Sequence, residues 1–109
     1  GEGNKKELSI INSDPYLIKV TINCLRELGI RDDEIKIGLR LFDDMNKNEM
    51  VNFWLKFLGL PKGSITFFEI IKGNKIGKLK YGMCRLRVKK GRKHFKFIIS
   101  MIDLIKSGV

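Results

Sequence analysis

The chain has 109 residues, a formal net charge of +10 and a hydrophobic fraction of 43%. This length suits a single domain spanning residues 1–109, whose core needs no metal or disulfide, and the seven Phe residues argue against disorder. Residues 1–62 hold 10 basic and 10 acidic residues, whereas residues 63–109 hold 12 basic residues against only Glu69 and Asp103. The excess charge therefore lies in the second part, which predicts a polyanionic partner, nucleic acid before an acidic membrane.

The first elements are marked by local signals. Residues 8–11 form a short apolar run typical of a strand. Asp14 is a suitable helix cap and Pro15 suits a first helical position, so a helix is expected to begin there. Its apolar stripe runs to Leu28, and Gly29 is expected to end it in the left-handed conformation.

A second strand and helix follow. Residues 35–42 alternate, with four apolar side chains on one face and Lys36, Gly38 and Arg40 on the other. Residues 46–58 carry an apolar stripe of helical period. Trp54 lies in that stripe and is expected in the core rather than as a platform for base stacking.

The second part of the chain predicts two more strands and a helix. Residues 65–71 are an apolar strand, and residues 73–77 form a glycine-rich turn into a basic strand at 78–90, so an antiparallel hairpin is expected. Residues 93–106 have an apolar helical stripe covering more than half the circumference. In the basic strand, Cys84, Leu86 and Val88 are expected to face inward, and Arg85, Arg87 and Lys89 outward.

Together these elements predict an α+β fold, a mostly antiparallel sheet with helices on one face and a basic outer face. A sheet fits the major groove of DNA, where Arg bonds guanine and Lys mostly meets phosphate. Nucleic-acid contacts are predicted for the basic residues of this face and of the neighbouring turns, and for one tyrosine: Lys36, Arg40, Lys75, Lys78, Tyr81, Arg85, Arg87, Lys89, Lys90, Arg92 and Lys93.

Cysteine usage and hydropathy indicate a cytoplasmic protein that does not enter a membrane. Cys24 and Cys84 occupy apolar positions, are expected to be buried thiols, and follow no signal-like start. The longest apolar run is interrupted by charged residues before it reaches spanning length. His94 has no Cys or second His at ligand spacing, so no zinc site is predicted.

Three parts of the chain carry a family resemblance. Residues 1–3 (Gly-Glu-Gly) resemble the end of the LAGLIDADG motif. Residues 11–15 (Ile-Asn-Ser-Asp-Pro) resemble the segment after that motif in homing-endonuclease-like proteins of bacteria and archaea. Residues 53–61 and 81–88 are similar to later signatures of the same group. The resemblance spans nearly the whole chain, and its strength lies in the order and spacing of the pieces.

The resemblance implies a nuclease that pairs two motif helices, as a homodimer or within one chain, and lays each sheet in the major groove. Glu2 would be the catalytic acid and the ligand of Mg²⁺, which keeps waters and neutralises charge during phosphodiester cleavage. The chain begins inside the motif, so cleavage is expected of a longer form, and an inert, solvated Glu2 is expected here.

Other functions stay open. A non-catalytic binding module, such as a transcription regulator, would use the same sheet without the acids. RNA binding would need exposed aromatic residues for base stacking, for which Tyr81 and, more weakly, Phe67 are candidates. An acid–base enzyme has little support, because the acidic cluster at 32–34 lies at an element end without a His or Ser constellation.

Overall fold

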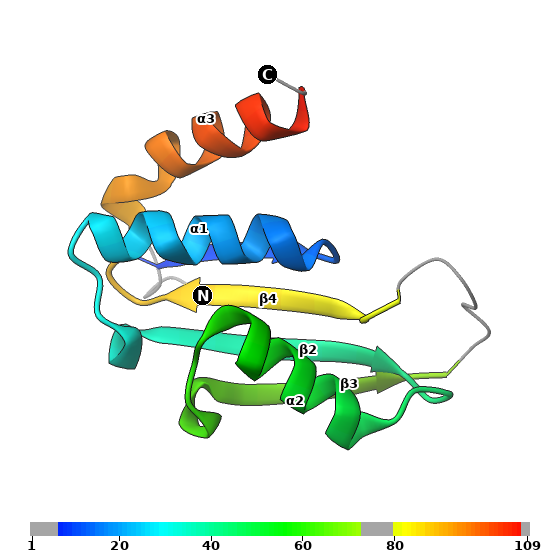
Figure 1. The fold of residues 1–109 in the computed structure, drawn as a ribbon. Coiled ribbons are helices and arrows are strands. Elements are labelled where there is room, and N and C mark those ends of the chain that lie inside the picture. Colours follow the sequence, from blue (N-terminus) through cyan, green and yellow to red (C-terminus); the bar gives the residue numbers. More distant parts are fainter. Residues whose placement is uncertain (1–6, 73–79, 108–109) are drawn as a thin grey trace.

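The computed structural model describes residues 7–72 and 80–107. Within them the chain forms four strands and three helices (Figure 1). In chain order these are β1 (Leu8–Asn12), α1 (Pro15–Glu27), β2 (Ile35–Phe42), α2 (Lys47–Leu58), β3 (Ile65–Ile71), β4 (Met83–Val88) and α3 (Phe95–Lys106). Single 3-10 turns at residues 32–34, 62–64 and 92–94 precede β2, β3 and α3; the last replaces the first residues of the helix predicted at 93–106.

Side-chain and glycine caps set the ends of the first two helices. The Asp14 carboxylate accepts a hydrogen bond from the Tyr16 backbone N–H at 2.9 Å, and Pro15 is the first helical residue. Asn46 does the same for α2, accepting from the Glu49 N–H at 3.0 Å. Gly59 ends α2 with a φ of 71°, the left-handed conformation that glycine adopts without strain. The predicted helix starts are confirmed.

The strands form one mixed sheet in the order β1-β4-β2-β3. β4 runs antiparallel to both β1 and β2, whereas β2 and β3 are parallel. The predicted hairpin between residues 65–71 and 78–90 is therefore wrong, because β2 lies between β3 and β4. The parallel pair follows from α2, which carries the chain back along the sheet before β3 begins, as the crossover of a parallel pair must.

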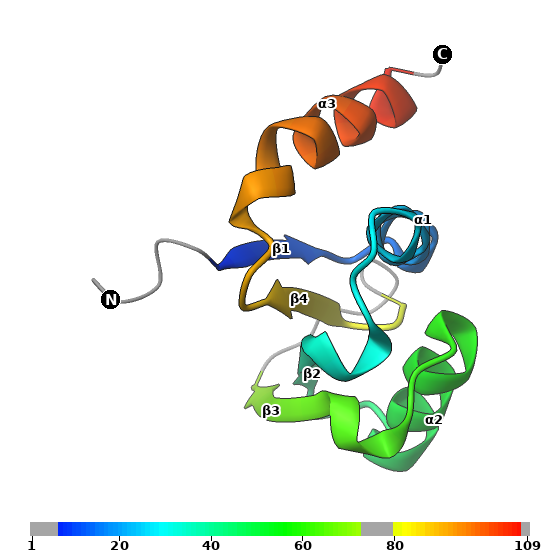
Figure 2. The same cartoon turned by 90° about the vertical axis from the view of Figure 1, so that its left-hand side faces the viewer.

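All three helices are on the same side of the sheet or beyond its β1 edge. Figure 2 shows α1 and α2 against one face, α3 beyond α1, and no described helix over the opposite face. The covered face supplies most of the core, including the fully buried Leu8, Ile37, Leu39 and Leu86. The α+β class is confirmed; α1 and α2 cover one face as predicted, whereas α3 lies beyond the β1 edge of the sheet. No helix in the described part of the chain is both long and apolar enough to span a bilayer.

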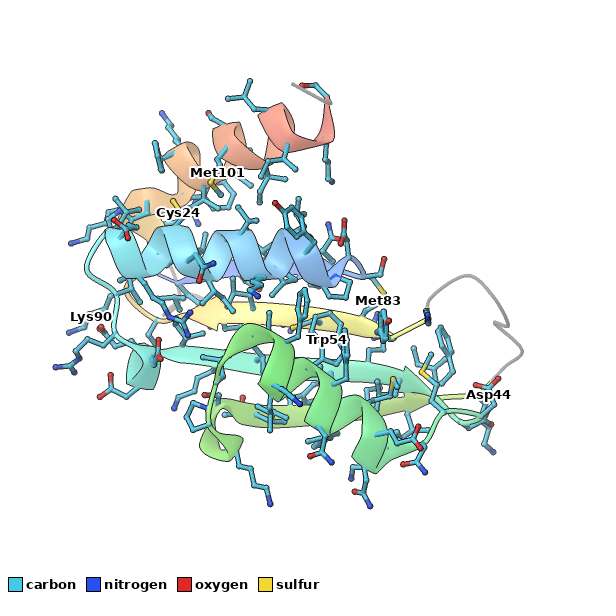
Figure 3. The ribbon with its side chains drawn as sticks, viewed as in Figure 1. Cys24, Asp44, Trp54, Met83, Lys90 and Met101 are labelled. Carbon is cyan, nitrogen blue, oxygen red and sulfur yellow. The ribbon has the colours of Figure 1, made fainter. Side chains whose placement is uncertain are left out.

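A contact from α2 fixes the beginning of β4. Trp54 of α2, labelled in Figure 3, is fully buried, as predicted. Its indole N–H donates a 2.8 Å hydrogen bond to the Tyr81 carbonyl. The next residue, Gly82, has a φ of +74°, and a Cβ placed there would lie 2.6 Å from the Arg40 carbonyl oxygen. Among the described residues from 80 onward, strand structure begins at Met83, so residues 80–82 of the strand predicted at 78–90 do not belong to it. This packing holds β4 against β2.

The two cysteines differ in environment. Cys84 of β4 is buried, and desolvation raises the pKa of its thiol to about 12. Cys24 lies half-buried on the side of α1 that faces α3 (Figure 3). Burial, and then the nearby Glu27 carboxylate, raise the pKa of Cys24. The predicted burial is confirmed for Cys84 but holds only in part for Cys24, and the two residues form no disulfide with each other.

Thiol labelling is expected to separate these two residues. A raised pKa means a smaller thiolate fraction at pH 8, and the thiolate is the reactive form. With an aromatic disulfide reagent at pH 8, we expect the native chain to release one equivalent of chromophore slowly, from Cys24. The second equivalent should require denaturant, and Cys24→Ser should abolish only the first. Rapid release of both from the folded chain would contradict the burial of Cys84.

Candidate nucleic-acid interface

The face of the sheet away from the helices is here called the open face. Strand alternation and register place on it the residues that alternate with the buried ones. They include Ser9, Ile11, Lys36, Gly38, Arg40, Phe67, Glu69, Met83, Arg85 and Arg87. The predicted sharing of one face by Lys36, Arg40, Arg85 and Arg87 follows from the direct pairing of β2 with β4.

Two cations stand directly opposite each other at one end of this face. Lys36 of β2 pairs with Arg87 of β4 in the antiparallel register, and Arg87 also pairs with Ser9 of β1. Side chains at opposed antiparallel positions are close neighbours, and like charges there are destabilising. Glu7 offsets part of this repulsion, since its carboxylate accepts a 2.6 Å hydrogen bond from Arg87 Nε and is mostly buried. Lys36 has no ion pair among the described residues.

The centre of the face holds a second row, with Ile11, Arg85, Gly38 and Phe67 side by side across the four strands. Arg85 is exposed and has no ion-pair partner in the described residues. A five-donor guanidinium held on a strand and free of a carboxylate is available to an external acceptor.

A third row contains Met83, Arg40 and Glu69. Arg40 Nε donates to the Glu69 carboxylate at 3.0 Å, and both side chains are nearly half-exposed. An exposed pair of this kind contributes about 0–1 kcal/mol and exchanges readily with an external anion. Nearby acids thus pair with two of the four cations that the strands place on the open face, Arg40 and Arg87.

A pocket of about 460 Å³ opens where the Lys36–Arg87 row meets the turn after β4. Lys89 and Lys90 lie in this turn and line the pocket together with Lys36, Arg87 and Thr66. Its acidic wall is formed by Glu7, Asp33 and Glu34. The strand predicted at 78–90 ends at Val88, but Lys89 and Lys90 still lie beside the cations of the open face.

Tyr81 does not lie on the open face, and that prediction is wrong. Its ring stacks on Phe53 of α2 with centroids 3.9 Å apart and an angle of 4° between the planes. The positive φ of Gly82 breaks the strand alternation before Met83, so Tyr81 faces the helices instead of the outer side. Phe67, the weaker aromatic candidate, is the ring that lies on the open face.

The remaining predicted residues fall in two groups. Arg92 places its guanidinium 5.1 Å from the centroid of the Phe95 ring at the start of α3, and Lys93 is exposed. Glu2, Lys75 and Lys78 lie outside the described residues. The sequence placed Gly38 on the outward side of its strand, but it identified neither Ile11 nor the central position of both residues, because that position depends on the pairing of strands distant in sequence.

The magnesium expected with Glu2 has no donor set in the described part of the chain, where no cluster of three or more His, Cys, Asp or Glu residues could hold an ion. The acids near the open face are instead engaged with arginines: Glu7 with Arg87, and Asp33 with Arg31 at 3.2 Å. No family model, curated protein or solved structure matches this chain.

Proposed function

We propose that this chain is a DNA-binding domain of the LAGLIDADG homing-endonuclease type that reads duplex DNA with its open face. The observation that carries the proposal is the opposition of Lys36 and Arg87 beside the unpaired Arg85, on a face that no described helix covers. The repulsion between cations held close together is reduced when a polyanion binds them, and a sheet fits the major groove of DNA.

In this proposal, different rows of the open face contact different parts of the DNA. Lys36, Arg87 and the turn lysines Lys89 and Lys90 gather at one end and would contact phosphates. Arg85, central and flanked by Gly38, has room to approach a base edge. Phosphate contacts position a protein on the duplex, whereas contacts to base edges specify sequence.

We propose metal-dependent cleavage only for a longer form of the protein that contains the complete motif helix. Glu2 would hold Mg²⁺ there, and a homodimer would bring a second acid to the other strand. The resemblance of residues 1–3 to the motif end supports this step, whereas the described residues themselves support binding. A Glu2→Gln variant of such a form should bind but not nick duplex, while the present chain should bind without Mg²⁺.

The salt dependence of binding tests the proposal. If five or six cations neutralise phosphates, the logarithm of the affinity for a 20-base-pair duplex should fall against the logarithm of the salt concentration with a slope of about −5. Fluorescence anisotropy between low and moderate salt measures this slope, with a single-stranded RNA of equal length as competitor. No binding at low salt would overturn the proposal, and stronger binding of the RNA would favour a single-strand reader.

A further inference from the structure

A small pocket lies at the centre of the open face, in the row that holds Arg85. Its volume is about 80 Å³. All four strands contribute to its walls, which are formed by Ile11, Gly38, Leu39, Arg40, Phe67, Met83 and Arg85. The pocket is therefore a product of the strand order and sits where the proposed function places the base edges of DNA.

Gly38 creates the pocket by lacking a side chain. A Cβ at this position would lie 3.2 Å from both Cβ and Cδ2 of Phe67, which is tighter than ordinary contact. The Phe67 side chain therefore lies over the backbone of Gly38, and the residue remains 50% exposed. A side chain at position 38 would require Phe67 to move by a few tenths of an ångström and would occupy part of the pocket.

The walls combine exposed apolar side chains with two arginines, on a face that is otherwise mostly polar. Ile11 is 44% exposed on one side of Arg85, and Phe67 is 50% exposed across Gly38 on the other. Exposed apolar side chains scattered singly need no explanation, but these surround a hollow together with Met83 and an unpaired guanidinium. A ligand for this row should present a small apolar group beside a hydrogen-bond acceptor.

The pocket is too small to enclose a base, but it has the size for a methyl group. In the major groove, thymine alone presents a methyl group, and apolar side chains read it by contact; guanine presents O6 and N7 to an arginine. Resting on the proposed function, we infer that the pocket receives the 5-methyl group of a thymine while Arg85 bonds an adjacent guanine. Because uracil lacks this methyl group, the same pocket favours DNA over RNA.

The test begins with selection of duplexes from a random-sequence library by the whole chain. The selected duplexes should share a thymine next to a guanine. Replacing that thymine by deoxyuridine, which changes neither charge nor pairing, should weaken binding about fourfold, the effect of withdrawing one methyl-sized group from an apolar contact. Phe67→Ala should remove the difference between thymine and deoxyuridine but keep the preference for guanine, whereas Arg85→Ala should do the reverse.

The matched control is Phe97→Ala, which truncates a phenylalanine of similar exposure on α3 and should leave the thymine–deoxyuridine difference unchanged. Circular dichroism checks that each variant is folded. Equal affinity for thymine and deoxyuridine duplexes, or a difference that survives in Phe67→Ala, would overturn the inference while leaving duplex binding intact. Failure to enrich any duplex would instead overturn the proposed function, and the inference with it.

Discussion

Replacing Trp54 by alanine is expected to lower the free energy of unfolding by about 4 kcal/mol, a large part of the stability of a domain this size. The indole is fully buried, packs edge-on against Phe53 with centroids 5.8 Å apart, and donates to the Tyr81 carbonyl at 2.8 Å. Alanine would leave a cavity between α2 and the sheet and an unpaired carbonyl at the start of β4. Urea unfolding followed by circular dichroism measures the loss.

Two further variants separate packing from the hydrogen bond. Trp54→Phe keeps most of the ring volume but removes the donor, so it should cost about 1–3 kcal/mol. Phe97→Ala removes a ring that is 57% exposed on α3, and should cost less than about 1 kcal/mol. If Trp54→Ala proved no more destabilising than Phe97→Ala, α2 would not hold the β4 strand in the way described.

The second large effect is expected on DNA binding. Lys36, Arg85 and Lys89 are three cations on or beside the open face with no ion pair among the described residues. The triple variant Lys36→Gln, Arg85→Gln, Lys89→Gln should bind duplex on the order of 100-fold more weakly near 0.15 M salt, because two lost phosphate contacts forgo counterion release and the Arg85 contact to a base edge is lost as well. Anisotropy titration of one labelled duplex gives the ratio of affinities.

A matched control removes the same charge from the helical side. Lys56 of α2 and Lys96 and Lys106 of α3 are exposed lysines on elements away from the open face. The variant Lys56→Gln, Lys96→Gln, Lys106→Gln has the same net charge as the first. It should weaken binding only a few-fold, through the long-range field of the whole chain. A similar loss in both variants would show that net charge alone attracts the duplex.

Local signals in the sequence were sufficient for most elements. Asp14 with Pro15 marks a helix start that the structure places at the expected residue, and the stripe predicted at 46–58 agrees with α2 at Lys47–Leu58. The alternation of residues 35–42 identified β2 and its outward residues. Such signals depend on backbone geometry within a few residues, so they can be predicted without knowledge of the rest of the fold.

Strand partners were not predictable in the same way. The turn at 73–77 favoured pairing β3 with β4, yet β3 lies beside β2 and contributes Glu69 to Arg40 and Phe67 to Gly38. Packing of the whole sheet against the helices, not the local pattern, decides which strands meet. The two ion pairs that neutralise part of the face, and the pocket at Gly38, therefore could not be foreseen.

Tyr81 illustrates the limit of extending a pattern. Alternation holds from Met83 to Val88, but the positive φ at Gly82 turns the chain, and the tyrosine stacks on Phe53 instead. The close approach of Gly82 to the Arg40 carbonyl requires glycine there, a constraint visible only once β2 and β4 are paired. A single glycine with a positive φ thus places the neighbouring side chain on the helical side of the sheet instead of the open face.

The salt dependence of duplex affinity for the chain and for its two triple variants tests most directly whether the open face binds DNA. The unaltered chain and the Lys56, Lys96, Lys106 variant should both show a slope of about −5, and the Lys36, Arg85, Lys89 variant a slope of about −3, because two of its three lost cations contact phosphates. Equal slopes in the two variants, or a shallower slope in the helical one, would contradict the open face as the DNA-binding surface.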